Sequence, residues 1–179
     1  MWVELAGGHA IIPEKEGPAL QISLLNRRTL LTGFAASAIL AGQRAAGAEA
    51  LPRIVVSKDP TCGCCTGWVD HLRQAGFTAE VIETPEINRV KVRLGVPQDL
   101  ASCHTAEIGG YVIEGHVPAD AIKRLLAEKP SGKGLAVPGM PMGSPEMEME
   151  GMAPEAYEVV LFGPSGRTTF ARYQGARPV

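Results

Sequence analysis

The hydrophobic positions in the middle of the chain alternate between the spacing of a strand and the spacing of a helix. Short runs rich in β-branched residues predict strands at 53–58 and 78–83. Each run is followed by a stretch in which apolar residues recur at helical spacing, so helices are expected at 63–75 and 85–94. The residues expected to face the core are Trp68, Val69 and Leu72 in the first helix and Ile87, Val90 and Leu94 in the second.

The pattern then changes to a hairpin and a third helix. Strands expected at 105–108 and 111–114 flank Gly109-Gly110, a dipeptide typical of tight hairpin turns. Residues 118–128 predict a helix that has a proline in its first turn. The whole order, strand-helix-strand-helix-strand-strand-helix, predicts an α/β domain of the thioredoxin-like class.

The last part of the chain combines a segment without periodicity and a second hairpin. Residues 129–154 are rich in methionine, glycine and proline and predict a long loop. Strands expected at 157–162 and 168–173 surround a Gly-Pro-Ser-Gly turn. The domain is therefore expected to end in a C-terminal β-hairpin.

The front of the chain is typical of an export signal. An arginine pair precedes an uncharged apolar run at 30–42, and two small-x-small cleavage patterns follow at 46–50. The pair, followed by Thr-Leu-Leu, is similar to a twin-arginine signal; a general secretory signal that carries two arginines is the alternative. We expect residues 1–50, an upstream extension plus the signal, to be removed. The apolar run at 30–42 is too short for a membrane span. The domain at 51–179 is then expected to be periplasmic and to have no membrane span.

Composition narrows the function classes. The net charge is −2 and aromatic residues make up 5% of the chain, so neither a basic surface nor base stacking points to nucleic acid. Three of the four cysteines fall within four positions, and such crowding suits a metal or a redox pair better than structural disulfides.

The cysteine cluster Cys62, Cys64 and Cys65 lies where the first strand is expected to meet the first helix. The first turn of a helix has free backbone N–H groups and the positive end of the helix dipole, and both favour thiolates. Thiolates select copper(I), zinc or iron–sulfur clusters. The cluster therefore predicts a soft-metal site.

Further soft ligands occur outside the cluster. Cys103 and His104 precede the strand at 105–108, and in a thioredoxin-like fold this segment faces the start of the first helix. His116 is a weaker candidate. Met140 and Met142 lie in the long loop, and thioethers suit copper(I) better than zinc.

Each of these features has an alternative interpretation. Cys62 and Cys65 have the C-x-x-C spacing of a redox pair, so a thiol–disulfide oxidoreductase is the main rival. Cys64 argues against it, because a third thiol would exchange with the disulfide. The methionines could also cover apolar surface. Met147, Met149 and Met152 alternate with glutamates and could form an arm that collects copper.

Four motifs in order carry a family resemblance: KDPTCGCC-x-x-WVDHLR, LGVP-x-x-LASCHTA, GYVIEGHVPA and KGLAVPGMP-x-GSPEME. Together they resemble the CopG-type proteins, small periplasmic metal-binding proteins of bacterial copper-resistance systems, long catalogued as a domain of unknown function. The resemblance extends from residue 54 to about residue 151. The ending GSPEMEME departs from the plainer GSPGME of the family.

The resemblance implies a thioredoxin-like fold that binds several copper(I) ions, in sequestration, redox adjustment or transfer of copper. Copper ions and other periplasmic copper-handling proteins are the implied partners. A copper delivery protein for a cuproenzyme is a further alternative, and a metal-binding role is favoured over a catalytic one. The implied core ligands are Cys62, Cys64, Cys65 and Cys103, with His104 and Met140 as neighbours of the site.

Overall fold

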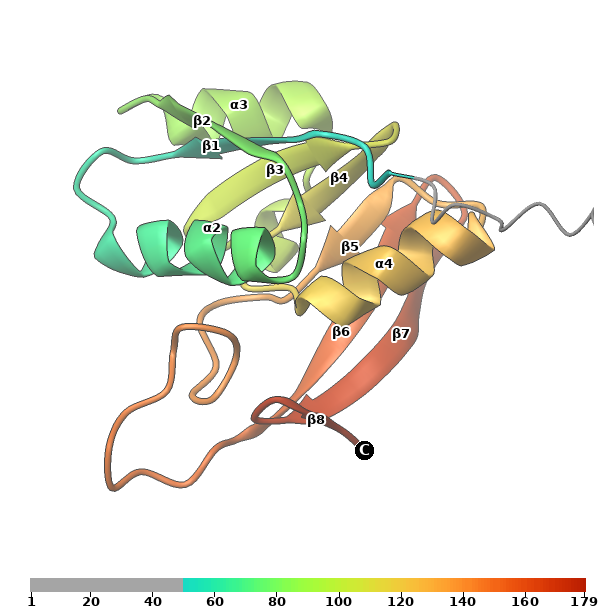
Figure 1. Ribbon diagram of the computed structural model, residues 1–179. Helices are drawn as coiled ribbons and strands as arrows, with labels where there is room; N and C mark the ends of the chain where they lie inside the picture. Colours follow the sequence, from blue (N-terminus) through green and yellow to red (C-terminus); the bar gives the residue numbers. More distant parts are fainter. Residues whose placement is uncertain (1–49) are drawn as a thin grey trace, which may run out of the picture. The chain divides into compact units, whose positions relative to one another are not determined.

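A mixed sheet of eight strands runs through residues 50–179, the part of the chain that the computed structural model describes. The strands lie in the order β2-β1-β3-β4-β5-β6-β7-β8 (Figure 1). The expected signal segment lies outside the described residues. None of the helices within residues 50–179 combines the length and the apolar character that a membrane crossing requires.

The elements confirm the mixed α/β class, and the seven that were predicted between residues 53 and 128 occur in the predicted order. The assignment to the thioredoxin-like class stays a prediction. In chain order the elements are β1 (Ile54–Lys58), α2 (Gly63–Gln74), β2 (Ala79–Glu83), α3 (Ile87–Leu94), the 3₁₀ turn η2 (Gln98–Leu100), β3 (His104–Ile108), β4 (Tyr111–Glu114), α4 (Ala119–Glu128), β5 (Gly134–Ala136), β6 (Ala156–Gly163), β7 (Gly166–Gln174) and β8 (Arg177–Pro178).

Strand direction follows from the connections. β1 and β2 are parallel, which requires a crossover, and α2 provides it. β3 is antiparallel to β1 and to β4. The predicted turn between β3 and β4 is confirmed: Gly109 and Gly110 both have positive φ, 55° and 86°, a combination that two-residue hairpin turns require and that side chains disfavour.

The predicted long loop at 129–154 is interrupted by one short strand, and the remainder, from residue 137 onward, contains no helix or strand. Within it, β5 pairs parallel to β4 and antiparallel to β6. All three residues of β5 are buried, so the sequence here lacks the alternation of apolar and polar residues that marks a half-buried strand. The predicted C-terminal hairpin is confirmed as β6 and β7, and through β5 it becomes part of the main sheet.

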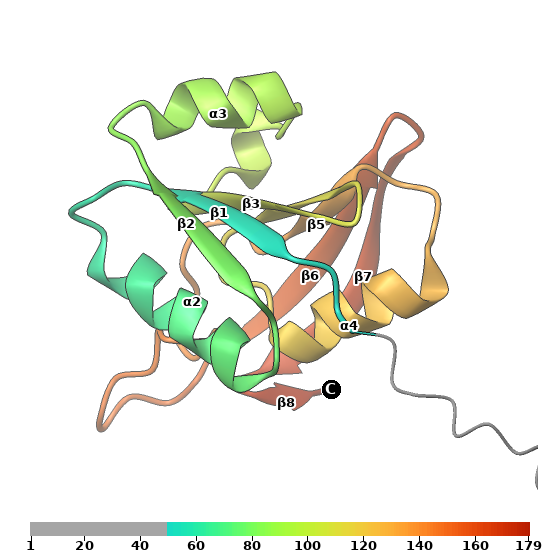
Figure 2. The same ribbon diagram turned by 45° about the horizontal axis from the view of Figure 1, so that its top comes forward.

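Helices cover both faces of the sheet. α2 and α4 lie on one face and α3 lies across the other (Figures 1 and 2). The predicted buried side of α2 is confirmed, because Trp68 and Leu72 are fully buried. The predicted buried side of α3 is only partly correct: the three apolar residues expected to face the core are half-buried, while Lys91 is 5% exposed.

Gly134 provides a test of β5. A Cβ atom at this position would overlap the carbonyl oxygen of Val112 on the neighbouring strand. Because the strand backbone cannot move away, Gly134→Ala should lower the free energy of unfolding by about 3 kcal/mol, the upper end of the cost of overpacking. Urea unfolding measures this change. Gly63→Ala is the control, since nothing lies within 4 Å of its added methyl group; equal stability of the two variants would contradict the β4–β5 pairing.

Candidate metal centre

The candidate ligands meet because of the register of two strand pairs. Lys58, the last residue of β1, lies opposite His104, the first residue of β3. The cysteine motif that follows β1 and the cysteine that precedes β3 therefore lie at the same end of the sheet. In the β3–β4 hairpin, Thr105 lies opposite Glu114, so the residues after β4 return to this end as well.

The four cysteine sulfurs form one cluster. The Sγ atoms of Cys62, Cys64, Cys65 and Cys103 all lie within 4.8 Å of one another. Cys62 is the N-cap of α2 and is joined to Cys65 by a disulfide, while Cys64 and Cys103 are free thiols. The Sγ atoms of Cys62 and Cys64 lie 3.5 Å apart. The sequence-predicted cysteines are thus brought together.

A second group of donors shares Cys103. Its sulfur lies 3.2 Å from Nδ1 of His104 and 3.1 Å from Nε2 of His116. His104 was a principal candidate, whereas His116 was ranked lower from the sequence. The hairpin register points to His116. Residue 103 comes two positions before Thr105, and residue 116 comes two positions after its partner Glu114, so the two residues lie next to each other at the same end of the hairpin.

Hydrogen bonding determines which nitrogen of His116 is free to bind a metal. Its Nδ1 lies 2.7 Å from the carbonyl oxygen of Pro145, which can only accept, so Nδ1 carries the hydrogen and donates it. Nε2 then presents its lone pair to Cys103. Metal-binding histidines are commonly oriented in this way by a second hydrogen bond. The donor set therefore fits a soft or borderline cation.

Burial controls the protonation of this group. Burial, followed by the charges of His116 and Lys91, holds the pKa of His104 well below its usual range. Burial also lowers the pKa of His116. Both imidazoles are therefore neutral at neutral pH, the form that binds metals. Burial and the neighbouring Cys64 raise the pKa of Cys103 to about 11, so a metal must displace its proton.

The loop after β5 packs against this centre. The backbone N–H and the hydroxyl of Ser144 both donate to the carbonyl of Pro141, in a turn that presents the Pro145 carbonyl to His116. A Cβ atom on Gly67 of α2 would lie 2.6 Å from Oε2 of Glu146, so the loop and this helix approach closely.

The methionines of this loop have less defined roles. Met140 is 52% exposed and Met142 is half-buried. Their part as metal ligands stays a prediction. Met149 and Met152 are 58% and 56% exposed, so they do not pack as core residues.

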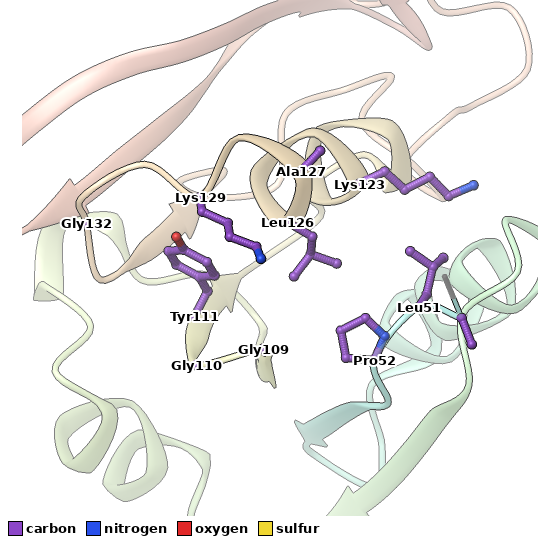
Figure 3. A pocket seen from close by; sticks show the side chains of 11 residues that line it. Leu51, Pro52, Gly109, Gly110, Tyr111, Lys123, Leu126, Ala127, Lys129 and Gly132 are labelled. Carbon is purple, nitrogen blue, oxygen red and sulfur yellow. The ribbon is translucent and has the colours of Figure 1, made fainter. Parts of the chain in front are cut away.

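A separate hollow of about 740 Å³ lies at the other end of the β3–β4 hairpin (Figure 3). Gly109, Gly110 and Tyr111 line one side of it, and Leu126 and Lys129 line the other. Its lining contains no cysteine or histidine. The metal-binding chemistry is therefore separate from this hollow.

Two solved structures are similar to the chain, and both are titled as the copper resistance protein CopG. Form 1 is 44% identical, with a TM-score of 0.65, over 70% of this chain and 99% of that chain. Form 2 is 42% identical, with a TM-score of 0.64, over 69% of this chain and 98% of that chain. A family described as "Protein of unknown function, DUF411" matches residues 100–147. No curated protein matches the chain.

The fold and the donor cluster define an α/β domain with a potential metal site rich in cysteine. The chain belongs to the CopG-like family of copper-resistance proteins. The resemblance carried by the four sequence motifs is thereby confirmed.

The buried histidines predict how stability depends on pH. Burial lowers the pKa of His104 and His116 in the folded protein, whereas in the unfolded chain they titrate near 6.5. As pH falls through about 6.5, the unfolded chain takes up protons that the folded protein does not, so stability is lost. Urea unfolding of metal-free protein should give a lower free energy of unfolding at about pH 5.5 than at about pH 7.5.

The control for this prediction is His104→Gln, which removes one of the titrating groups. Its stability should fall less steeply over the same pH range, with each removed histidine accounting for up to about 1.4 kcal/mol per pH unit. A parent protein whose stability is constant across this range would contradict the buried, neutral state of the two imidazoles.

Proposed function

We propose that the chain is an exported, periplasmic copper(I)-binding protein of copper resistance or copper homeostasis. The observation that carries the proposal is the convergence of four cysteine sulfurs, all within 4.8 Å of one another. The export signal predicted from the sequence before residue 51 supports the proposed periplasmic location. The proposed ligands are Cys62, Cys64, Cys65, Cys103, His104 and His116, with Met140 or Met142 completing or covering the site.

The chemistry of the donors supports copper(I) over harder cations. Thiolate sulfur, neutral imidazole and thioether are ligands that copper(I) accepts well, and no carboxylate belongs to either donor group within the described residues. One copper(I) ion neutralises only one thiolate. Four thiolates in contact therefore favour several ions that share sulfurs, so the proposed site is multinuclear.

Loading requires the cysteines to be reduced. The Cys62–Cys65 disulfide yields two thiols when it takes up two electrons and two protons, which a thiol reductant supplies. Reduction thus raises the number of free thiols from two to four. The protein then sequesters copper, adjusts its redox state or transfers it to other copper-handling proteins in the periplasm.

The ligand assignment predicts the effect of single substitutions. Cys103→Ser should weaken copper(I) binding by more than the roughly 10–100-fold that follows the loss of a residue hydrogen-bonded to a ligand, because Cys103 itself belongs to both donor groups. Met149→Leu is the control and should bind like the parent, since its side chain is exposed. Competition with a chromophoric copper(I) chelator measures both affinity and stoichiometry.

The stoichiometry also separates two forms of the proposal. Reduced parent protein should bind more than one ion per chain. A single transferable ion would instead favour a delivery protein for a cuproenzyme. Absence of competition with the chelator would contradict copper(I) binding altogether.

A thiol–disulfide oxidoreductase is the second candidate function, and the Cys62–Cys65 disulfide favours it. Cys64 opposes it, because a free thiol 3.5 Å from Cys62 is placed to exchange with the disulfide. We expect metal-free protein to be inactive in insulin reduction. Rapid insulin reduction that survives Cys64→Ala, with loss of activity in Cys62→Ser, would favour the oxidoreductase instead.

A further inference from the structure

An ion pair is buried on the α3 face of the sheet, behind the candidate metal centre. Nζ of Lys91 lies 2.5 Å from Oε1 of Glu114, and the two residues are 5% and 0% exposed. Removing two charges from water carries a large desolvation cost, and apolar replacements of such pairs are often equally stable or more stable. Stability alone is therefore a weak reason for the pair, and its other contacts indicate what it does.

The pair has contacts on both sides of the Cys103-His104 dipeptide. Before it, the backbone N–H of Ser102 donates to Oε1 of Glu114 at 2.6 Å. After it, the hydroxyl of Thr105 donates to Oε2 of Glu114 at 2.6 Å and accepts from Lys91 at 2.8 Å.

The pair cannot itself be a ligand of the centre. Side chains alternate between the faces of a strand, so Thr105 faces α3 while His104 faces α2 and packs against Trp68, with ring centroids 4.2 Å apart. Glu114 lies opposite Thr105 and shares its face. The sheet therefore separates the ion pair from the cysteine cluster, so the pair acts on the position of the cluster through the backbone.

The segment before β3 needs such support. Ser102 and Cys103 lie outside the strand, so the β1–β3 ladder does not hold them. Two side-chain contacts do: the carboxylate of Glu114 binds the Ser102 backbone, and the Ser102 hydroxyl donates to the carbonyl of Gly139. The first of these depends on Lys91, because burying a carboxylate without a cationic partner carries a large desolvation cost.

We propose that Lys91 and Glu114 are positioning residues of the metal centre, which hold the Cys103 sulfur within reach of the other three cysteines. This inference rests on the proposed copper-binding function. The carboxylate holds the backbone at Ser102 and the side chain at Thr105, so the dipeptide between them has little freedom to move. Preorganised ligands bind a metal without first losing conformational entropy.

Two double variants of the full chain test this role without leaving a buried charge. In Lys91→Met/Glu114→Leu, both charges and the acceptor for Ser102 are removed. In Lys91→Met/Glu114→Gln, the amide oxygen can still accept from Ser102 and the amide nitrogen can still donate to Thr105. The probe is copper(I), added to reduced protein in competition with a chromophoric chelator.

The leucine variant should lose roughly 10–100-fold in copper(I) affinity, and the glutamine variant should stay close to the parent. X-ray absorption should show fewer copper–sulfur contacts per ion in the leucine variant alone, a change that a loss of stability would not produce. The control is Arg53→Met/Glu80→Gln, which removes an exposed ion pair at the opposite end of β1 and should change neither measurement.

A single variant, Thr105→Val, replaces the leucine variant in this test if the leucine variant does not fold. It preserves the side-chain shape and the ion pair but removes the hydroxyl between them, and it should also weaken copper(I) binding. A folded leucine variant that binds like the parent, or an unchanged Thr105→Val protein, would overturn the positioning role alone. No copper(I) uptake by the parent would overturn the proposed function and this inference with it.

Discussion

The antiparallel pairing of β1 with β3 is the constraint on which the candidate metal centre depends. It places Lys58 opposite His104, so the chain leaves β1 and enters β3 at the same end of the sheet. The hydrogen bonds between β1 and β3 thereby bring the cysteine motif next to Cys103, although about forty residues separate them along the chain. A shift of one residue in this register would turn His104 to the opposite face and take it away from Trp68.

The donors differ in how firmly the fold holds them. His104 and His116 are fully buried, and His116 is oriented by the Pro145 carbonyl. Cys64 is less buried and lies in the first turn of α2, and Met140 is exposed. The centre thus combines a rigid half, built on the β3–β4 hairpin, with a more adaptable half. Under the proposed function, such a division suits an ion that has to be bound selectively and later released.

Local patterns predicted most of the fold, while features that depend on tertiary contacts were missed. Trp68 and its neighbours show a helical period over a whole helix, so α2 was predictable. β5 has only three residues, too few for any period, and it exists because β4 and β6 pair with it. The burial of Lys91 could not be predicted from the sequence either, because a lysine is buried only where a partner such as Glu114 is buried beside it. His116 required the hairpin register rather than its own position in the sequence.

Crowding of sulfur explains why a disulfide, a protonated thiol and a candidate metal site occur together. Four thiolates within 4.8 Å would repel one another strongly, so the metal-free protein cannot keep all of them ionised. Pairing Cys62 with Cys65 removes two of the charges, and the raised pKa of Cys103, about 11, removes another at neutral pH. Soft cations offer a third solution, since they neutralise the thiolates without separating them. Under the proposed function, the same short distances that destabilise the reduced, metal-free cluster favour its occupation by several monovalent ions.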